Sequence, residues 1–132
     1  MDADRLAAIS LFADLSSDDR ERIAAKASEK VAAIGDVLAS QGDFGYALYA
    51  IESGTAEVSV DGRLLRVLGP GDVFGEIAVL ASGRRTASVV ATSPLQLIAL
   101  FNRDVWALER EAPGAAERLR ALIAERQTAT AS

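Results

Sequence analysis

The stretch at residues 56–68 decides the fold class, and it reads AEVSVDGRLLRVL. Residues 56–60 alternate between apolar and polar side chains, which is typical of a half-buried strand. Asp61-Gly62 is the strongest short-range signal for a hairpin turn. Residues 63–68 then form the return strand, which Gly69-Pro70-Gly71 ends. The stretch therefore predicts an antiparallel hairpin.

Turn signals recur on both sides of this hairpin, at the spacing of about 8–12 residues that short antiparallel strands show. Examples are Gly35-Asp36 and Gln41-Gly42-Asp43. The apolar or alternating segments near these signals predict further strands, at residues 37–40, 47–51, 87–91 and 95–101. Many short strands in this arrangement favour an antiparallel jelly-roll or barrel.

A helical part precedes the strands. Residues 3–9 are rich in alanine and carry Leu6 and Ile9, which fits a short helix. A second helix is expected over about 17–27, because a serine N-cap is followed by two acidic residues, which the helix dipole favours in a first turn.

Two helices are also expected after the last strand. Asn102 is a good N-cap for a helix over 103–110, and Pro113 suits the first turn of a last helix over 113–126. Residues 128–132 form a small polar tail that we expect to be frayed. The apolar residues of the last helix recur at helical spacing and are Ala115, Leu119, Leu122 and Ile123.

One domain is expected for residues 1–132, of class α+β, with strands in 29–101 between helices in 1–28 and 102–127. The chain carries 14 basic and 19 acidic residues, a net charge of −5, and neither cysteine nor histidine. A negative net charge disfavours binding to nucleic acid. The lack of cysteine and histidine excludes disulfides, thiolate catalysis and the commonest metal ligands and general base.

The sequence shows no targeting segment. Its N-terminus lacks the basic region and the unbroken apolar core of a signal peptide. The longest apolar runs are about five residues, whereas a membrane span needs about 20. We therefore expect a cytoplasmic protein with no direct contact with a membrane.

Residues 71–88 carry the chemistry, and they read GDVFGEIAVLASGRRTAS. Arg84-Arg85 is the only adjacent basic pair of the chain, and it follows a stretch, residues 31–83, with two basic and seven acidic residues. A basic pair in acidic surroundings indicates a local anion site rather than a surface for a polyanion.

The residues before the basic pair supply the other half of such a site. Residues 75–80 predict one or two helical turns opened by Gly75, and the free N–H groups of a helix start attract an anion. The small side chain of Ala78 leaves the path to these groups open. Arginine offers a planar fork to two phosphate oxygens, and the Thr86 hydroxyl is a further donor.

Glu76 would repel an anion unless its carboxylate serves another group of the ligand. An ionised glutamate only accepts hydrogen bonds, so a sugar hydroxyl next to the phosphate is a suitable partner. Together these residues indicate a ligand with a phosphate and a vicinal hydroxyl.

The stretch FGEIA at residues 74–78, followed by RTAS at 85–88, resembles the phosphate-binding cassette of cyclic nucleotide-binding domains. Residues 83–89 look most like the channel branch of that family. The resemblance extends over nearly the whole chain, through residues 42–45, 48–51 and 68–72 and the flanking helices. It implies an eight-stranded antiparallel β-roll between N-terminal and C-terminal helices, and a non-catalytic sensor.

The resemblance also implies roles for single residues in binding cAMP or, less favoured, cGMP. Arg85 would bind the cyclic phosphate, Glu76 the ribose 2′-hydroxyl, and Thr86 the phosphate or the purine. Lesser contacts are expected from Ser88, and the C-terminal helices would act as a lid. The remaining expected contacts are backbone contacts of Gly75, Ile77 and Ala78 and weaker ones of Val73 and Leu122. Tyr46 departs from the family, which often has an acidic residue there.

Plainer structural roles compete with these. A basic pair such as Arg84-Arg85 could also lie in a solvated turn, and of the two we expect Arg84 to be exposed and not to bind the ligand. Glu76 would favour the helix dipole without any ligand. Thr86 and Ser88 suit strand positions. The apolar residues of the last helix could pack in the core.

Other functions stay open as well. A jelly-roll enzyme such as a cupin needs histidine ligands, which the chain lacks. A degenerate roll used only for protein–protein contact is the main alternative. The sensor half of a transcription factor would need a helix-turn-helix, which does not follow residue 126. The effector domain or homodimer partner on which such a sensor could act is not visible in this chain.

Overall fold

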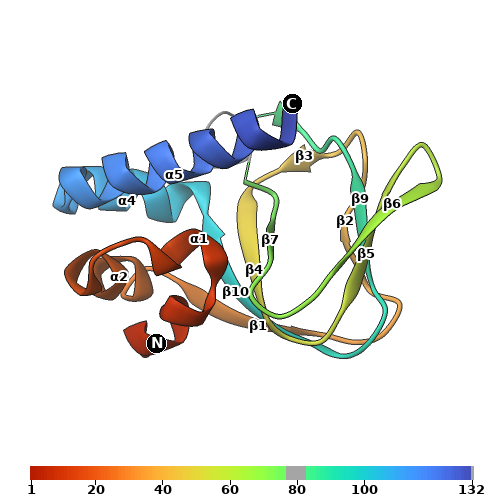
Figure 1. The fold of residues 1–132 in the computed structure, drawn as a ribbon, viewed down its shortest axis with the longest axis horizontal. Coiled ribbons are helices and arrows are strands. Elements are labelled where there is room, and N and C mark those ends of the chain that lie inside the picture. The colour runs from red at the N-terminus through yellow and green to blue at the C-terminus, as the bar shows by residue number, and fades with distance from the viewer. Residues whose placement is uncertain (77–82, 132) are drawn as a thin grey trace.

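The computed structural model describes residues 1–76 and 83–131, and it folds into a two-sheet β-roll with helices from both ends of the chain packed on one side (Figure 1). The helices are η1 (Ala3–Ala8), α1 (Ser10–Ala13), α2 (Ser17–Ala24), α4 (Asn102–Glu111) and α5 (Pro113–Ala131). The strands are β1 (Ser28–Ala32), β2 (Val37–Ala39), β3 (Phe44–Gly45), β4 (Ala47–Ser53), β5 (Ala56–Val60), β6 (Arg63–Leu68), β7 (Val73–Phe74), β8 (Gly83–Arg84), β9 (Ser88–Ala91) and β10 (Leu95–Phe101).

Two four-stranded antiparallel sheets make up the roll. The first has the order β1-β10-β4-β7 and the second the order β2-β9-β5-β6, and a short ribbon of β3 and β8 is added to these eight strands. The expected α+β architecture with an eight-stranded β-roll is therefore confirmed. The hairpin at residues 56–68 is confirmed too. Asp61 and Gly62 both have positive φ, at 52° and 78°, as a two-residue turn of type I′ requires.

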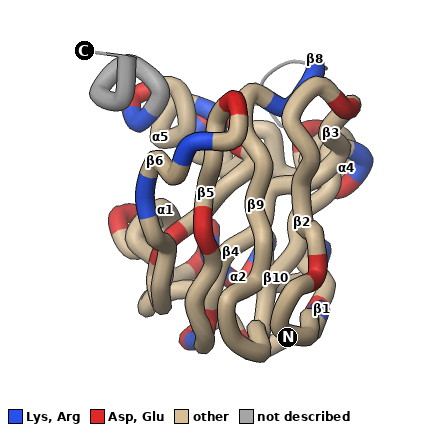
Figure 2. The backbone as a smooth tube through the Cα atoms, turned by 90° about the vertical axis from the view of Figure 1, so that its right-hand side faces the viewer, with Lys and Arg blue, Asp and Glu red and all other residues tan. Residues whose placement is uncertain are grey.

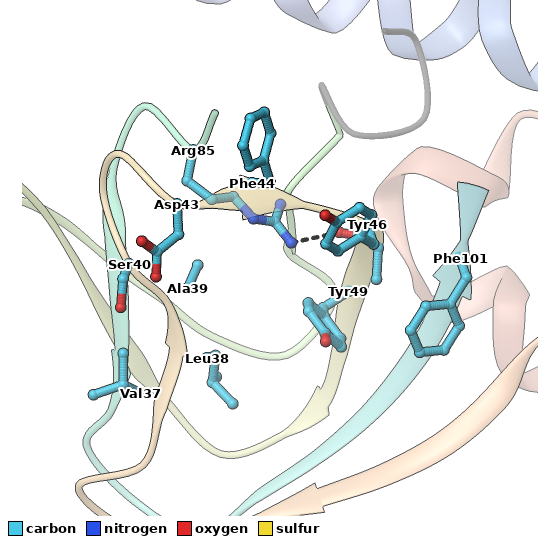
Figure 3. A pocket seen from close by; sticks show the side chains of 11 residues that line it. Val37, Leu38, Ala39, Ser40, Asp43, Phe44, Tyr46, Tyr49, Arg85 and Phe101 are labelled. Atoms are coloured by element: carbon cyan, nitrogen blue, oxygen red, sulfur yellow. Dashed lines mark hydrogen bonds between the residues drawn. The ribbon is translucent and has the colours of Figure 1, made fainter. Parts of the chain in front are cut away.

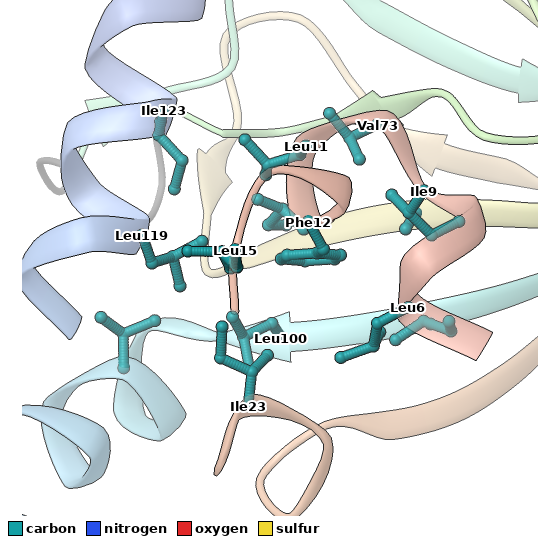
Figure 4. Packing of buried hydrophobic residues seen from close by; sticks show 14 of the residues in the cluster. Leu6, Ile9, Leu11, Phe12, Leu15, Ile23, Val73, Leu100, Leu119 and Ile123 are labelled. Atoms are coloured by element: carbon teal, nitrogen blue, oxygen red, sulfur yellow. The ribbon is translucent and has the colours of Figure 1, made fainter. Parts of the chain in front are cut away.

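The first sheet is covered on both of its faces, because alternate residues of a strand point to opposite sides. Leu48 and Ala50 of β4 belong to a cluster under the helices, whereas Tyr49 and Ile51 belong to the cluster inside the roll. Figure 4 shows the helical cluster, in which Leu119 and Ile123 of α5 pack against residues of the N-terminal helices.

The N-terminal and C-terminal helices are held together by polar contacts as well. Asp19 is almost fully buried, and its carboxylate accepts hydrogen bonds from Arg118 Nε at 2.5 Å and Nη2 at 2.9 Å. Arg118 lowers the pKa of Asp19 through these bonds. The hydroxyl of Ser16 caps α2, the helix that carries Asp19, by accepting a hydrogen bond from the N–H of Asp19, as expected.

Several boundaries differ from the sequence-based expectation. The helix expected over 17–27 ends at Ala24, and α4 begins one residue early, with the side chain of Asp104 accepting from the N–H of Phe101. The helix α5 continues to Ala131, through the tail that was expected to be frayed. Within the described ranges, no helix is both long and apolar enough to cross a membrane.

Candidate functional site

Arg85 lies between β8 and β9, where its backbone is fixed to the turn before β3. Its N–H donates to the carbonyl of Asp43 at 2.6 Å, and its carbonyl accepts from the N–H of Gly42 at 2.9 Å. The side chain is half-buried. Its Nη2 donates to the carbonyl of Ala47 at 2.9 Å, so strand β4 holds the guanidinium in place.

Two glycines enclose the guanidinium of Arg85. A Cβ atom on Gly45 would lie 2.5 Å from Arg85 Nε, and one on Gly75 would lie 2.2 Å from Arg85 Nη1. Gly75 also has a φ of +79°, a conformation that favours glycine. Any larger residue at either position would displace the arginine. Gly75 was expected to contact the ligand through its backbone, and here that backbone lies close to the guanidinium of Arg85.

The charge of Arg85 is partly desolvated, and this burial lowers the pKa of the guanidinium. Within the described parts of the chain, no carboxylate forms an ion pair with it. A half-buried cation without an acidic partner retains a strong attraction for an anion.

A cavity of about 290 Å³ lies beside Arg85 (Figure 3). Eight of its eleven lining residues are aromatic or aliphatic, and Ser40, Asp43 and Arg85 add polar groups. Gly75 and Glu76 do not line it, so the cavity adjoins the predicted cassette on the side of β3 and β4. The lining residues are Val37, Leu38, Ala39, Ser40, Asp43, Phe44, Tyr46, Ala47, Tyr49, Arg85 and Phe101.

The other residues of the predicted cassette have different surroundings. Glu76 is half-buried next to Gly75, and Thr86 is exposed directly after Arg85. Ile77 and Ala78 lie outside the described residues. The hydroxyl of Ser88 accepts from the N–H of Gln41 at 2.9 Å, which is the structural role expected of a strand serine.

Val73 and Leu122 do not line the cavity beside Arg85. Val73 is 1% exposed and packs in the helical cluster, so its side chain offers a ligand no open surface. Leu122 packs against the same cluster and lines a separate cavity of about 240 Å³ beside Ser10 and Leu11. Contact of Leu122 with a ligand would need α5 to lie differently.

Arg84 plays a different role from its neighbour. It is exposed, donates from Nη1 to the carbonyl of Gly42 at 2.7 Å, and has its guanidinium 4.6 Å from the centre of the Phe44 ring. The two arginines therefore form a matched pair for experiments, since only Arg85 lies between the glycines.

Sequence reasoning missed Gly45 and Ala47 as supports of Arg85. Both lie about 40 residues before the arginine, so no local spacing connects them to it. The glycine in GDFG at residues 42–45 was the available signal, because a glycine within a strand often marks a close approach of another group.

Comparisons with known proteins identify the family of this chain. The family model described as cyclic nucleotide-binding domain matches residues 29–111. The chain is 42% identical over 97 residues to a cyclic AMP receptor protein of Thermus thermophilus, covering 70% of this chain and 45% of that protein. It is 35% identical over 100 residues to a cAMP-dependent protein kinase regulatory subunit of Yarrowia lipolytica, covering 76% and 24%.

A solved structure shows the same fold. The N-terminal domain of a transcriptional regulator from Streptomyces coelicolor superposes with a TM-score of 0.81 at 33% identity, covering 96% of this chain and 92% of that one. The chain spans less than half the length of the two curated relatives.

Proposed function

This chain belongs to the cyclic nucleotide-binding domain family, and on that premise we propose that it is a regulatory sensor that binds a 3′,5′-cyclic purine nucleotide, cAMP in preference to cGMP. The observation that carries the proposal is the guanidinium of Arg85, half-buried between Gly45 and Gly75 without an acidic partner in the described residues. The module binds its ligand and performs no reaction on it.

The cyclic phosphate would bind Arg85. The phosphate carries one negative charge, and a planar guanidinium donates two parallel hydrogen bonds to such a group. The carbonyl of Ala47 and the two glycines support this role, because they fix the plane of the guanidinium before a ligand arrives. The exposed hydroxyl of Thr86 would add a donor beside it.

Glu76 would accept a hydrogen bond from the ribose 2′-hydroxyl. It directly follows Gly75, whose backbone lies close to the guanidinium of Arg85, and this closeness supports a place for Glu76 in the same site. Backbone contacts from Ile77 and Ala78, and a weak one from Ser88, complete the proposal.

The C-terminal helices would convey binding to an effector in another domain or a partner chain. In this structure the apolar stripe of α5 is buried on the helical cluster, and Arg118 ties α5 to Asp19 of α2. The N-terminal helices and α5 would therefore shift together. Hydrogen exchange with and without cAMP tests this: residues 115–126 should gain protection, and exchange there that ignores the ligand would contradict the lid.

Calorimetric titration with cAMP and cGMP tests the binding itself. Arg85→Ala removes a charge-assisted partner worth about 1.5–3 kcal/mol, which corresponds to a roughly 10–150-fold weaker Kd. Arg84→Ala is the matched control, and we expect it to bind like the wild type. No heat with either nucleotide would favour the interaction-only alternative, and a preference for cGMP above about tenfold would overturn the ranking.

A further inference from the structure

Strand β6 forms an outer edge of the second sheet. It pairs with β5 alone in the described part of the chain, and the β5–β6 hairpin extends away from the body of the roll (Figure 1). Backbone N–H and C=O groups on the far side of β6 therefore face away from the sheet. An edge of this kind can pair with a further strand.

The side chains of β6 are apolar and exposed to an unusual degree. Leu64, Leu65 and Val67 are 61%, 65% and 59% exposed. Proteins commonly protect a sheet edge with charged residues or a bulge, and β6 has both, since its pairing with β5 shifts in register near Leu65. The three exposed aliphatic side chains favour association with another chain, which is the opposite of what charges and a bulge achieve. Protection of the edge alone therefore does not explain the sequence of β6.

The charge of β6 is opposite to that of its surroundings. Arg63 and Arg66 are the only basic residues between residues 31 and 83, where seven residues are acidic. Both are exposed on β6, where Figure 2 shows the basic positions in blue. Neither forms an ion pair with any residue in the described ranges.

We propose that β6 is a docking site for an extended segment of another protein in which acidic and apolar residues alternate. The segment adds to the sheet as a fifth strand next to β6. Main-chain hydrogen bonds along the edge supply affinity in this mode of recognition, and alternate side chains supply specificity. The acidic residues pair with Arg63 and Arg66, while the apolar ones cover Leu64, Leu65 and Val67.

A second copy of this chain fits the edge less well. A two-fold contact between two β6 strands brings four arginines together, and like charges on adjacent strands are destabilising. A stable protein interface also involves about 20–30 residues on each side, whereas three exposed aliphatic side chains form this patch. An added strand needs less surface, because its backbone hydrogen bonds contribute as well.

Fluorescence anisotropy with labelled synthetic octapeptides tests the proposal on the full chain. One peptide alternates valine and glutamate, a second alternates valine and lysine, and a third is the first with alternate backbone nitrogens methylated. We expect the acidic peptide to bind at least tenfold more tightly than either of the others. In NMR spectra of the protein, binding of the acidic peptide should change the chemical shifts of residues 63–68.

Charge-reversed variants identify the site. The double variant Arg63→Glu/Arg66→Glu should weaken binding of the acidic peptide at least tenfold. The matched control, Arg22→Glu/Arg110→Glu, makes the same change of charge at exposed positions of α2 and α4 and should bind normally. If charge reversal disturbs folding by circular dichroism, Arg63→Gln/Arg66→Gln replaces it, with a smaller loss expected.

Four results would overturn the proposal. They are equal binding of the acidic and basic peptides, equal binding of the methylated peptide, unchanged affinity in the β6 double variant, and no binding at millimolar peptide. Sedimentation that shows self-association through β6 would also overturn it, in favour of a second copy as the occupant.

Discussion

Substituting Gly45 by alanine should weaken nucleotide binding without removing any charge or any of the ligand contacts proposed above. The added Cβ would lie 2.5 Å from Arg85 Nε and 2.7 Å from Arg85 Cζ. Ordinary van der Waals contact begins at 3.4 Å, so the guanidinium must move by about 0.9 Å. The backbone of Gly45 has no positive φ, and the alanine itself is therefore unstrained.

A displacement of this size breaks the 2.9 Å hydrogen bond from Arg85 Nη2 to the Ala47 carbonyl and misaligns the fork that the phosphate would meet. Misaligned hydrogen bonds weaken steeply. We expect a loss of affinity for cAMP that approaches the loss in Arg85→Ala, up to about 1.5–3 kcal/mol or roughly 10–150-fold in Kd.

The assay is calorimetric titration with cAMP, together with thermal unfolding followed by circular dichroism. Gly69→Ala is the matched control, because a Cβ there meets nothing within 4 Å and the glycine has no positive φ. Wild-type affinity in a folded Gly45→Ala protein would refute the argument that the two glycines position Arg85. Equal weakening by both substitutions would refute it as well.

Three further changes have defined outcomes. Replacing cAMP by its 2′-deoxy analogue should weaken binding to the wild type but not to Glu76→Gln. A double-mutant cycle measures this coupling. Equal binding of both ligands to the wild type would leave Glu76 without a role at the ribose. Arg118 lowers the pKa of Asp19 below its usual 3.8, so the ionised carboxylate stabilises the fold above that pH, and the contribution disappears as the pH falls through the lowered value. The free energy of unfolding, measured with urea, should therefore fall less between neutral pH and about pH 3 in Arg118→Gln than in the wild type. Parallel curves for the two proteins would contradict the assignment. Truncation after Glu111 should weaken cAMP binding about tenfold or more; unchanged affinity in a folded truncated chain would reduce α5 to packing.

The hairpin at residues 56–68 was predictable because its information is local. Alternating side chains and an Asp-Gly turn lie within 13 residues, and the structure forms the turn with both residues at positive φ. The serine cap of α2 is local in the same sense. Strands β3, β7 and β8 have two residues each, which is too short for any periodicity to be seen, so they are set by neighbouring strands alone.

The candidate site was predictable in part for the same reason. Gly75 and Arg85 lie ten residues apart in one motif, and the structure brings them into contact. Gly45 and Ala47 come from another part of the roll. The pairing of β3 with β8 brings Gly45 close to Arg85, and a hydrogen bond to the Ala47 carbonyl joins Arg85 to β4. Burial of Val73 under the helices follows from β7 pairing with β4, which the sequence of β7 does not reveal.

Strand β4 offers the ligand site and the helices a common support. The carbonyl of Ala47 holds the guanidinium of Arg85, and the next residue, Leu48, is fully buried beneath the helices. In the proposed sensor, an anion bound to the arginine would therefore act on the strand that also supports the helical layer, one peptide unit away. The distance that such a signal would have to cross is the thickness of one sheet.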